Sequence, residues 1–249
     1  MQTQAPVQPV IDSTLRAGEM TSAFQRSGRL HIPGFLTETS ARSLHAGLAS
    51  ENLWMCSTIG GGTVAEIPIE MLEAMSIDQR AKLTALAHAE ARDGFHYMFD
   101  TVRISDTLEK GQTLPAFYRS IFDFLNSEAF LAFVRTLTGD PRATYVDAQA
   151  TRFLPGHYLT KHDDRKPTAS RLYAYVLNLT PTWRADWGGL LSFHDDDGHV
   201  AEAYTPSWNA LNIFQVPQPH SVSFVAPFAG GPRLSITGWI RDDRPKLPF

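Results

Sequence analysis

Two His-x-Asp triplets, at residues 162–164 and 194–196, each offer an imidazole and a carboxylate that could bind one metal ion. Alternate residues of a β-strand project from the same face, so His162 and Asp164 could hold one ion together while Asp163 points away. The second triplet begins at His194 and continues into residues 195–198, a sequence typical of a solvated hairpin turn. We therefore expect the metal site at the first triplet.

A third ligand is expected at His220, within the sequence Gln-Pro-His-Ser-Val at 218–222. It follows His162 by 58 residues, which is enough chain for several strands to cross and bring the two histidines together. Two histidines and one carboxylate occupy one face of a metal ion and leave three coordination positions open for substrates and oxygen. Such a site can perform chemistry on molecules that enter those positions.

An alternating segment at 232–240 puts Arg233, Ser235, Thr237 and Trp239 on one face of a strand and apolar residues on the other. An inward-facing arginine needs an anionic partner, because an unpaired buried charge is very costly. The guanidinium group matches a carboxylate through two parallel hydrogen bonds. The partner is therefore either a protein carboxylate in a structural salt bridge or the carboxylate of a bound molecule.

The elements that must position these residues change in character near residue 141. The chain before it shows helical patterns, whereas the chain after it is rich in Val, Tyr, Phe, Thr and Trp and is cut by turn clusters. Short strands at this spacing predict an antiparallel sandwich or barrel. No linker divides the chain, so residues 1–249 are predicted to form a single domain, with a mainly helical layer over 1–141 and a β core over 142–241. We expect helices over residues 15–25, 37–50, 76–93, 115–125 and 127–139, and a flexible glycine-rich loop over 58–63.

Composition excludes several classes of protein. The 22 basic residues are scattered and the formal net charge is −4, so a nucleic-acid partner is not expected. No apolar run approaches the length of a membrane span, and residues 1–13 lack the pattern of a secretory signal. The single cysteine, Cys56, cannot form an internal disulfide, so we expect the reducing cytoplasm as the location. The sequence predicts no particular oligomeric state.

Four segments in the second half of the chain form a recognisable set. They are Leu-Thr-Lys-His-Asp-Asp at 159–164, Trp-Gly-Gly-Leu at 187–190, Pro-His-Ser-Val at 219–222 and Arg-x-Ser-x-Thr-Gly-Trp at 233–239. Together they resemble the iron(II)/2-oxoglutarate-dependent dioxygenases, and within these the prolyl hydroxylase-like group. The likeness is greatest to the prolyl dihydroxylases of ribosomal protein and their bacterial relatives, and it is firm over about residues 143–241.

The resemblance implies an α+β protein with a mainly β core. That core would be a double-stranded β-helix, similar to a jelly roll or cupin, with the N-terminal helices packed on its major sheet. His162, Asp164 and His220 would bind iron(II), and Arg233 would bind the distal carboxylate of the cosubstrate 2-oxoglutarate. Dioxygen would be the second cosubstrate, with ascorbate in a supporting role. The implied reaction hydroxylates an unactivated C–H bond, most plausibly of a prolyl residue in a protein or peptide.

Further residues take part in this interpretation. Phe153 and Asn178 fall where relatives often have tyrosines that hold 2-oxoglutarate, and Phe153 cannot donate a hydrogen bond whereas Asn178 can. Tyr145 could supply a replacement hydroxyl if its strand is regular, and Thr237 shares the face of Arg233. The residues expected to contact substrate are Trp239, Tyr158 and Arg171, each with a structural role as the alternative.

Two other functions remain open at this point. The same chemistry could act on a free amino acid or another small molecule instead of a polypeptide. A metal-binding β-barrel module without oxygenase activity is the alternative from another class, although such a module would have no use for an arginine that binds a carboxylate.

Overall fold

The computed structural model describes residues 6–166 and 170–245, and within them a 13-stranded sheet is the central element. Every strand pair in it is antiparallel, and the main path runs β1-β11-β8-β13-β6-β4-β7-β12-β9-β10. The strands are β1 Arg29–Pro33, β2 Met55–Gly60, β3 Thr63–Pro68, β4 Tyr97–Val102, β5 Tyr145–Val146, β6 Gln149–Phe153, β7 Tyr158–His162, β8 Arg171–Asn178, β9 Leu191–His194, β10 Val200–Tyr204, β11 Ala210–Gln215, β12 His220–Val222 and β13 Arg233–Arg241.

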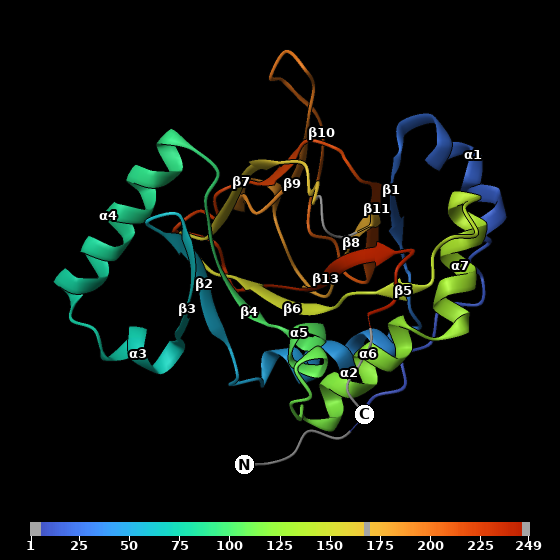
Figure 1. The fold of residues 1–249 in the computed structure, drawn as a ribbon, viewed down its shortest axis with the longest axis horizontal. Helices are drawn as coiled ribbons and strands as arrows, with labels where there is room; N and C mark the ends of the chain where they lie inside the picture. The colour runs from blue at the N-terminus through green and yellow to red at the C-terminus, as the bar shows by residue number, and fades with distance from the viewer. Residues whose placement is uncertain (1–5, 167–169, 246–249) are drawn as a thin grey trace.

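The sheet curls until its two ends nearly meet (Figure 1). Side chains bridge the remaining gap between β1 and β10: Arg29 forms a 2.5 Å ion pair with Glu202, and the rings of His31 and Tyr204 lie 5.4 Å apart. The result is an almost closed barrel. This agrees with the double-stranded β-helix predicted from the sequence.

The two helices within residues 69–93 lie apart, beside β2 and β3, and the other helices cover one side of the barrel, beneath and beside β13 and β6 in Figure 1. Their buried faces and the outer face of the sheet share one large apolar core, which includes Leu44 of α2, Phe117 of α6, Val134 of α7 and Ile236 of β13. The helices are α1 Ala17–Ser27, α2 Glu38–Ala49, α3 Ile69–Ala74, α4 Ile77–Asp93, α5 Ile104–Glu109, α6 Ala116–Leu125 and α7 Glu128–Thr138, with a short 3-10 turn at Ala185–Trp187. No helix in the described ranges is long and apolar enough to span a bilayer.

Local capping signals explain why the helix predictions agree with the structure to within a few residues. The Thr37 side chain accepts a hydrogen bond at the start of α2, and Ser76 and Gln79 form a reciprocal capping box at the start of α4. Ser127 caps α7, which ends at Gly139 in the left-handed conformation (φ 73°).

The N-terminal part contains more sheet than the sequence indicated. Strands β1 to β4 all lie before residue 142, and they join the same sheet as the later strands. The glycine-rich segment 58–63, expected to be a flexible loop, is instead the tip of the β2–β3 hairpin, with Gly61 and Gly62 at positive φ in its turn. Strand β4 lies between β6 and β7 and pairs with both.

Candidate metal and cosubstrate site

Strand pairing brings together two histidines that are far apart in the sequence. His162 is the last residue of β7 and His220 is the first of β12, and the two are direct partners across the antiparallel pair. Their ring centroids lie 4.1 Å apart. Because partner residues of an antiparallel pair project from the same face of the sheet, both imidazoles enter the barrel.

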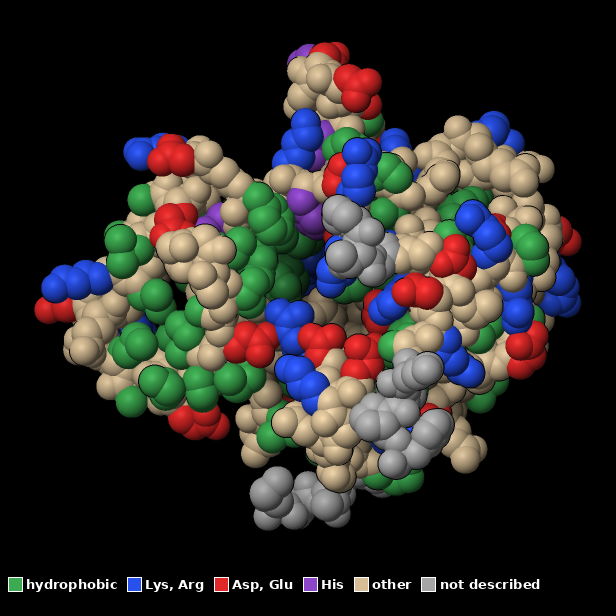
Figure 2. All heavy atoms as spheres, in the orientation of Figure 1, with side chains coloured by type: hydrophobic (Ala, Val, Ile, Leu, Met, Phe, Trp, Pro, Cys, Tyr) green, Lys and Arg blue, Asp and Glu red, His purple; other side chains and the backbone are tan. Residues whose placement is uncertain are grey.

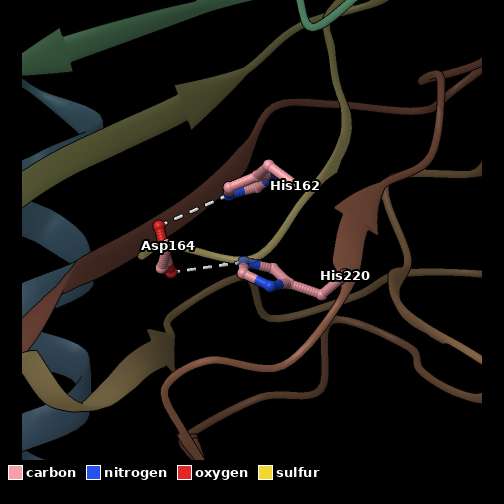
Figure 3. A group of neighbouring side chains, drawn as sticks. All are labelled: His162, Asp164 and His220. Carbon is pink, nitrogen blue, oxygen red and sulfur yellow. Dashed lines mark ion pairs between the residues drawn. The ribbon is translucent and has the colours of Figure 1, made fainter. Parts of the chain in front are cut away.

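Asp164 reaches this pair by a different route from the one expected. The strand ends at His162, so Asp164 does not share its pleat, and it lies in the irregular segment that follows, with the left-handed backbone conformation (φ 62°). Aspartate tolerates this conformation better than most residues do. Figure 3 shows the carboxylate pointing at both rings, with Oδ1 3.5 Å from Nε2 of His162 and Oδ2 3.4 Å from Nε2 of His220.

The hydrogen bonds of the two imidazoles leave the same nitrogen available on each. Nδ1 of His162 lies 2.9 Å from the carbonyl oxygen of Thr160, and Nδ1 of His220 lies 2.8 Å from that of Gln218. A carbonyl only accepts, so both Nδ1 atoms carry the proton and both Nε2 atoms present a lone pair towards Asp164. This is the arrangement that metal-binding histidines usually have.

Burial sets the charges of the cluster. It lowers the pKa of His220 to about 4, with a further contribution from His162, so this imidazole is neutral at neutral pH. The pKa of Asp164 is lowered although burial opposes this, so its side chain is a carboxylate at neutral pH. Two imidazoles and one carboxylate, with their donor atoms all within 4.8 Å of one another, can together hold a divalent cation.

The three side chains line a cavity inside the barrel that also contains Arg233. The cavity encloses about 550 Å³, part of it open to solvent, and most of its remaining walls are apolar. The space-filling view is hollowed near the middle of this face, with histidine and hydrophobic side chains at the edge of the hollow (Figure 2).

Arg233 is the first residue of β13 and is 2% exposed. Its guanidinium carbon lies 5.1 Å from the centre of the Phe153 ring, and burial lowers its pKa to about 10. Among the described residues, neither Nε nor Nη1 of Arg233 has a hydrogen-bond partner, and no ion pair to it is formed. The structural salt bridge that the sequence left open is therefore not present in that part of the chain.

The residues proposed from the sequence to assist Arg233 lie in different places. Thr237 lines the cavity, where its hydroxyl accepts a hydrogen bond from Gln149. Asn178 is fully buried beside Ser235, and its Oδ1 has no partner among the described residues. The expectation that Tyr145 supplies a hydroxyl to the cavity is corrected. Tyr145 belongs to the helix-covered core, and its hydroxyl donates to Glu109.

Of the three substrate candidates, one lines the cavity and a second lines a neighbouring pocket. Trp239 lines it, and Arg171 stacks on the Trp239 ring with 3.5 Å between guanidinium carbon and ring centre. Nη1 of Arg171 also donates to the backbone carbonyl of Asp164. Arg171 thus contacts the turn that carries one of the potential metal ligands.

Tyr158, the first residue of β7, points to the outside of the barrel and away from the cavity. Its hydroxyl contacts Nδ1 of His96 and the carbonyl of Ala87, and it lines an outer groove beside α4 rather than the cavity. The reason is a register shift between β7 and β12. His162 pairs with His220 and Leu159 pairs with Val222, so β7 contains one residue more than β12 between these two pairs. A bulge of this kind reverses the alternation of faces, and counting in steps of two from His162 therefore misplaces Tyr158.

Sequence reasoning missed several residues at the site. Phe95 is 50% exposed and its ring lies 5.3 Å from that of His162, while Phe99 of β4 forms part of the cavity wall. Thr151 of β6 also lines the cavity. The alternation of Thr151 and Phe153 along β6 was a usable signal, but nothing in the sequence indicated that β4 joins the barrel.

Comparisons with known proteins agree with this geometry. Residues 148–241 match the family model described as the 2OG-Fe(II) oxygenase superfamily. A stretch of 119 residues is 33% identical to "Prolyl 3-hydroxylase OGFOD1" of Mus musculus, covering 45% of this chain and 21% of that protein. This chain thus matches about a fifth of the length of that relative.

Solved structures extend the likeness to most of the chain. A 2OG-Fe(II) oxygenase family oxidoreductase from Burkholderia pseudomallei superposes with a TM-score of 0.61 at 13% identity, covering 98% of both chains. A prolyl hydroxylase from Trichoplax adhaerens, solved with a hypoxia inducible factor peptide fragment, gives a TM-score of 0.54 at 14% identity over 90% of this chain and 89% of that one. At these identities the comparison shows the fold. Residues 148–241 therefore match the 2OG-Fe(II) oxygenase superfamily, and the chain is similar in fold to that family's structures, prolyl hydroxylases included.

Proposed function

We propose that this protein is an iron(II)- and 2-oxoglutarate-dependent dioxygenase that hydroxylates a prolyl residue of a protein or peptide. The observation that carries the proposal is the buried guanidinium of Arg233, which has no anion to bind within residues 6–166 and 170–245 and lies in the same cavity as the His162–Asp164–His220 cluster. A bound molecule with a carboxylate and a metal-chelating group could pair with the guanidinium and at the same time bind a metal ion held by the cluster.

The residues present fit iron(II). Ligand bonds of about 2.1 Å at angles near 90–110° would separate neighbouring donor atoms by about 3 to 3.5 Å. The measured separations of 3.4 and 3.5 Å between Asp164 and the two histidines need little adjustment. His162, Asp164 and His220 would hold the ion, and the Nδ1–H bonds to backbone carbonyls would keep both rings oriented.

The residues present also fit 2-oxoglutarate. The guanidinium of Arg233 would bind the distal carboxylate of the cosubstrate and would thereby recover the interaction energy that it lacks in the free protein. The apolar walls around it, including Phe153 and Leu191, keep water away and strengthen that interaction. When bound, iron(II) and 2-oxoglutarate supply the oxidation that puts one atom of dioxygen into a C–H bond and yields succinate and carbon dioxide.

Similarity supports the prolyl part of the proposal. The curated relatives in mouse and Xenopus laevis are both prolyl 3-hydroxylases, and the Trichoplax structure was solved with a peptide. Phe95 lies beside His162, and the stacked pair Arg171 and Trp239 lies beside Asp164. These groups can contact an apolar pyrrolidine ring and a peptide carbonyl. Cytoplasm is the proposed location, consistent with one free, buried cysteine.

The test measures succinate formed from 2-oxoglutarate with iron(II), ascorbate and dioxygen, first without an added substrate. We expect turnover by the wild type and none by His162→Ala. His199→Ala is the matched control, because its imidazole is 82% exposed in the β9–β10 turn, and it should behave as the wild type. Equal background amounts of succinate from the wild type and His162→Ala would refute the proposed enzymatic activity and favour the metal-binding module.

A second experiment identifies the substrate class. A proteome is incubated with the wild type or with His162→Ala, and peptides are compared by mass spectrometry. Proline residues that gain one oxygen only with the wild type would support the proposal. Turnover stimulated by free amino acids, with no proline oxidised in any protein, would replace the prolyl substrate with a small molecule.

A further inference from the structure

A second hollow lies on the outer surface of the two strands that carry His162 and His220. It is a groove of about 850 Å³, part of it open to solvent, between the C-terminal half of α4 and the outer faces of β7 and β12. Neighbouring residues of a strand point to opposite faces, so Lys161 and Ser221 line this groove while the two histidines line the cavity. The groove and the metal cluster are thus on opposite faces of the same strand pair.

Three aromatic rings form the apolar part of the groove. The rings of His88 on α4, Tyr158 on β7 and Phe224 after β12 have centroids 5.9 to 6.1 Å apart in each pair. Tyr158 is 6% exposed, whereas Phe224 is 46% exposed. A large ring that remains half in water beside a buried aromatic cluster gains free energy when a partner covers it. The groove therefore offers a place for one large apolar side chain.

The permanently charged side chains that line the groove are basic. They are Arg92 and Lys161, and no acidic residue in the described part of the chain lines it. Arg92 is paired with Asp93 at 3.2 Å, whereas Lys161 is exposed and forms no ion pair with a described residue. Burial and the charge of Lys161 lower the pKa of His194, so this imidazole is neutral at neutral pH. Because the whole chain has a formal net charge of −4, a basic groove on it favours an anionic partner locally.

The groove also lies close to the metal cluster along the chain. Lys161 and His162 are the last two residues of β7, and the side chain of His162 is 16% exposed. Side chains that leave one strand in opposite directions end roughly 10 to 15 Å apart, and an extended chain advances about 3.3 Å per residue. A polypeptide that passes round the end of β7 would therefore need about three to five residues to reach from the metal cluster to Lys161.

We propose that this groove binds an acidic segment of the polypeptide substrate while the target prolyl residue lies at the metal. A carboxylate of the segment pairs with Lys161, and a large apolar side chain packs on Phe224. The inference rests on the proposed function and adds to it the sequence context of the substrate: an Asp or Glu and a large apolar residue within a few residues of the target proline. Binding at a second place raises the effective concentration of the proline at the metal, so the groove lowers KM and leaves kcat unchanged.

The test compares the affinities of two fluorescent peptides that share one central proline. On both sides of the proline, about four residues away, one peptide has the sequence Asp-Phe-Asp and the other Lys-Phe-Lys. Binding is measured by fluorescence anisotropy at low ionic strength, with manganese(II) and 2-oxoglutarate present so that no turnover occurs. The wild type should bind the acidic peptide about tenfold more tightly than the basic one, and added salt should reduce the difference.

Two variants test the two parts of the groove. Lys161→Glu should remove the preference for the acidic peptide, and Lys82→Glu is the matched control because Lys82 is an exposed lysine of α4 outside the groove. Phe224→Ser should weaken binding of the acidic peptide by about threefold to tenfold. Its control is Phe228→Ser, since Phe228 is 68% exposed and does not line the groove.

The affinity for 2-oxoglutarate separates a local effect from general damage. It should be equal in the wild type, Lys161→Glu and Phe224→Ser, because neither side chain lines the cavity. With a peptide that is hydroxylated, both variants should raise KM and keep kcat.

Equal affinity of the wild type for the two peptides would overturn the inference and leave the proposed function standing, and so would a preference for the acidic peptide that survives in Lys161→Glu. A wild-type dimer that Lys161→Glu dissociates would assign the groove to a second copy of the chain. A single-stranded RNA oligonucleotide that binds more tightly than the acidic peptide, and that both variants fail to bind, would assign the groove to nucleic acid. Either result would overturn the inference. Absence of 2-oxoglutarate binding to the metal-loaded wild type would instead overturn the proposed function, whether or not the acidic peptide binds.

Discussion

Replacing Arg233 with methionine distinguishes a ligand-binding arginine from a structural one, because the two roles have opposite effects on stability. Burial lowers the pKa of Arg233 from 12.5 to about 10. A difference of that size means that the unpartnered charge costs the folded protein about 3 kcal/mol. Methionine removes the charge and keeps an apolar chain of similar reach, at the loss of the contact with Phe153, which contributes about 1 to 2 kcal/mol.

The free energy of unfolding should therefore rise by about 1 to 2 kcal/mol in the variant without ligand, which for a chain of this size raises the melting temperature by about 2 to 8 °C. Ligand reverses the order. With manganese(II) in place of iron to prevent turnover, 2-oxoglutarate at 100 times its dissociation constant should stabilise the wild type by about 2.7 kcal/mol and leave Arg233→Met unchanged. Thermal unfolding with and without 2-oxoglutarate measures both effects in one series.

Two results would refute this reasoning. A variant that loses more than about 2 kcal/mol without ligand would show that Arg233 holds the fold together, as a satisfied structural ion pair does. A variant that keeps the full stabilisation by 2-oxoglutarate would show that the cosubstrate carboxylate lies elsewhere.

Three further predictions concern residues away from the metal cluster. Burial raises the pKa of Asp147 from 3.8 to about 6, so the folded state binds more protons than the unfolded one between these values and loses stability as pH rises through them. The unfolding free energy of Asp147→Asn, relative to that of the wild type, should therefore increase by about 2 kcal/mol from pH 4.5 to pH 7, as measured by urea unfolding at both pH values. A difference between the two proteins that is the same at both pH values would contradict this prediction. Burial raises the pKa of the Cys56 thiol to about 12, so an aromatic disulfide reagent at pH 8 should react only after denaturation. A Cβ at Gly47 would lie 2.2 Å from the Phe117 ring, so Gly47→Ala should lower the unfolding free energy by about 1 to 3 kcal/mol, whereas Gly18→Ala, with 3.9 Å of clearance, should not.

The parts of the fold that the sequence predicted are those set by local signals. Caps and periodic apolar residues are read from a few neighbouring positions, and the helices from 37 to 50 and from 127 to 139 were predicted for that reason. Residue chemistry singled out the site only in combination, because the sequence contains two His-x-Asp triplets. The strand context of the first triplet, together with His220 and the arginine on the polar face of an alternating strand, decided between them.

Long-range pairing accounts for what the sequence left undetermined. Strand β4 is buried on both faces, so it shows no clear alternation, and its place in the sheet depends on partners about 50 and 60 residues away. The left-handed backbone of Asp164 and the bulge before His162 have no sequence signature of their own. The first changes how the carboxylate reaches the cluster, and the second removes Tyr158 from it.

The position of β4 also bears on whether residues 148–241, which match the family model, can fold independently. The family likeness begins at residue 148, yet β6 and β7 are joined across the barrel wall by β4, and Asp100 of β4 forms a 2.8 Å ion pair with Arg152 of β6. A fragment limited to 148–241 would lack β4, so the backbone amides and carbonyls of β6 and β7 that pair with it would have no hydrogen-bond partners. The stretch by which the family is recognised is therefore shorter than the smallest piece of this chain that could fold by itself.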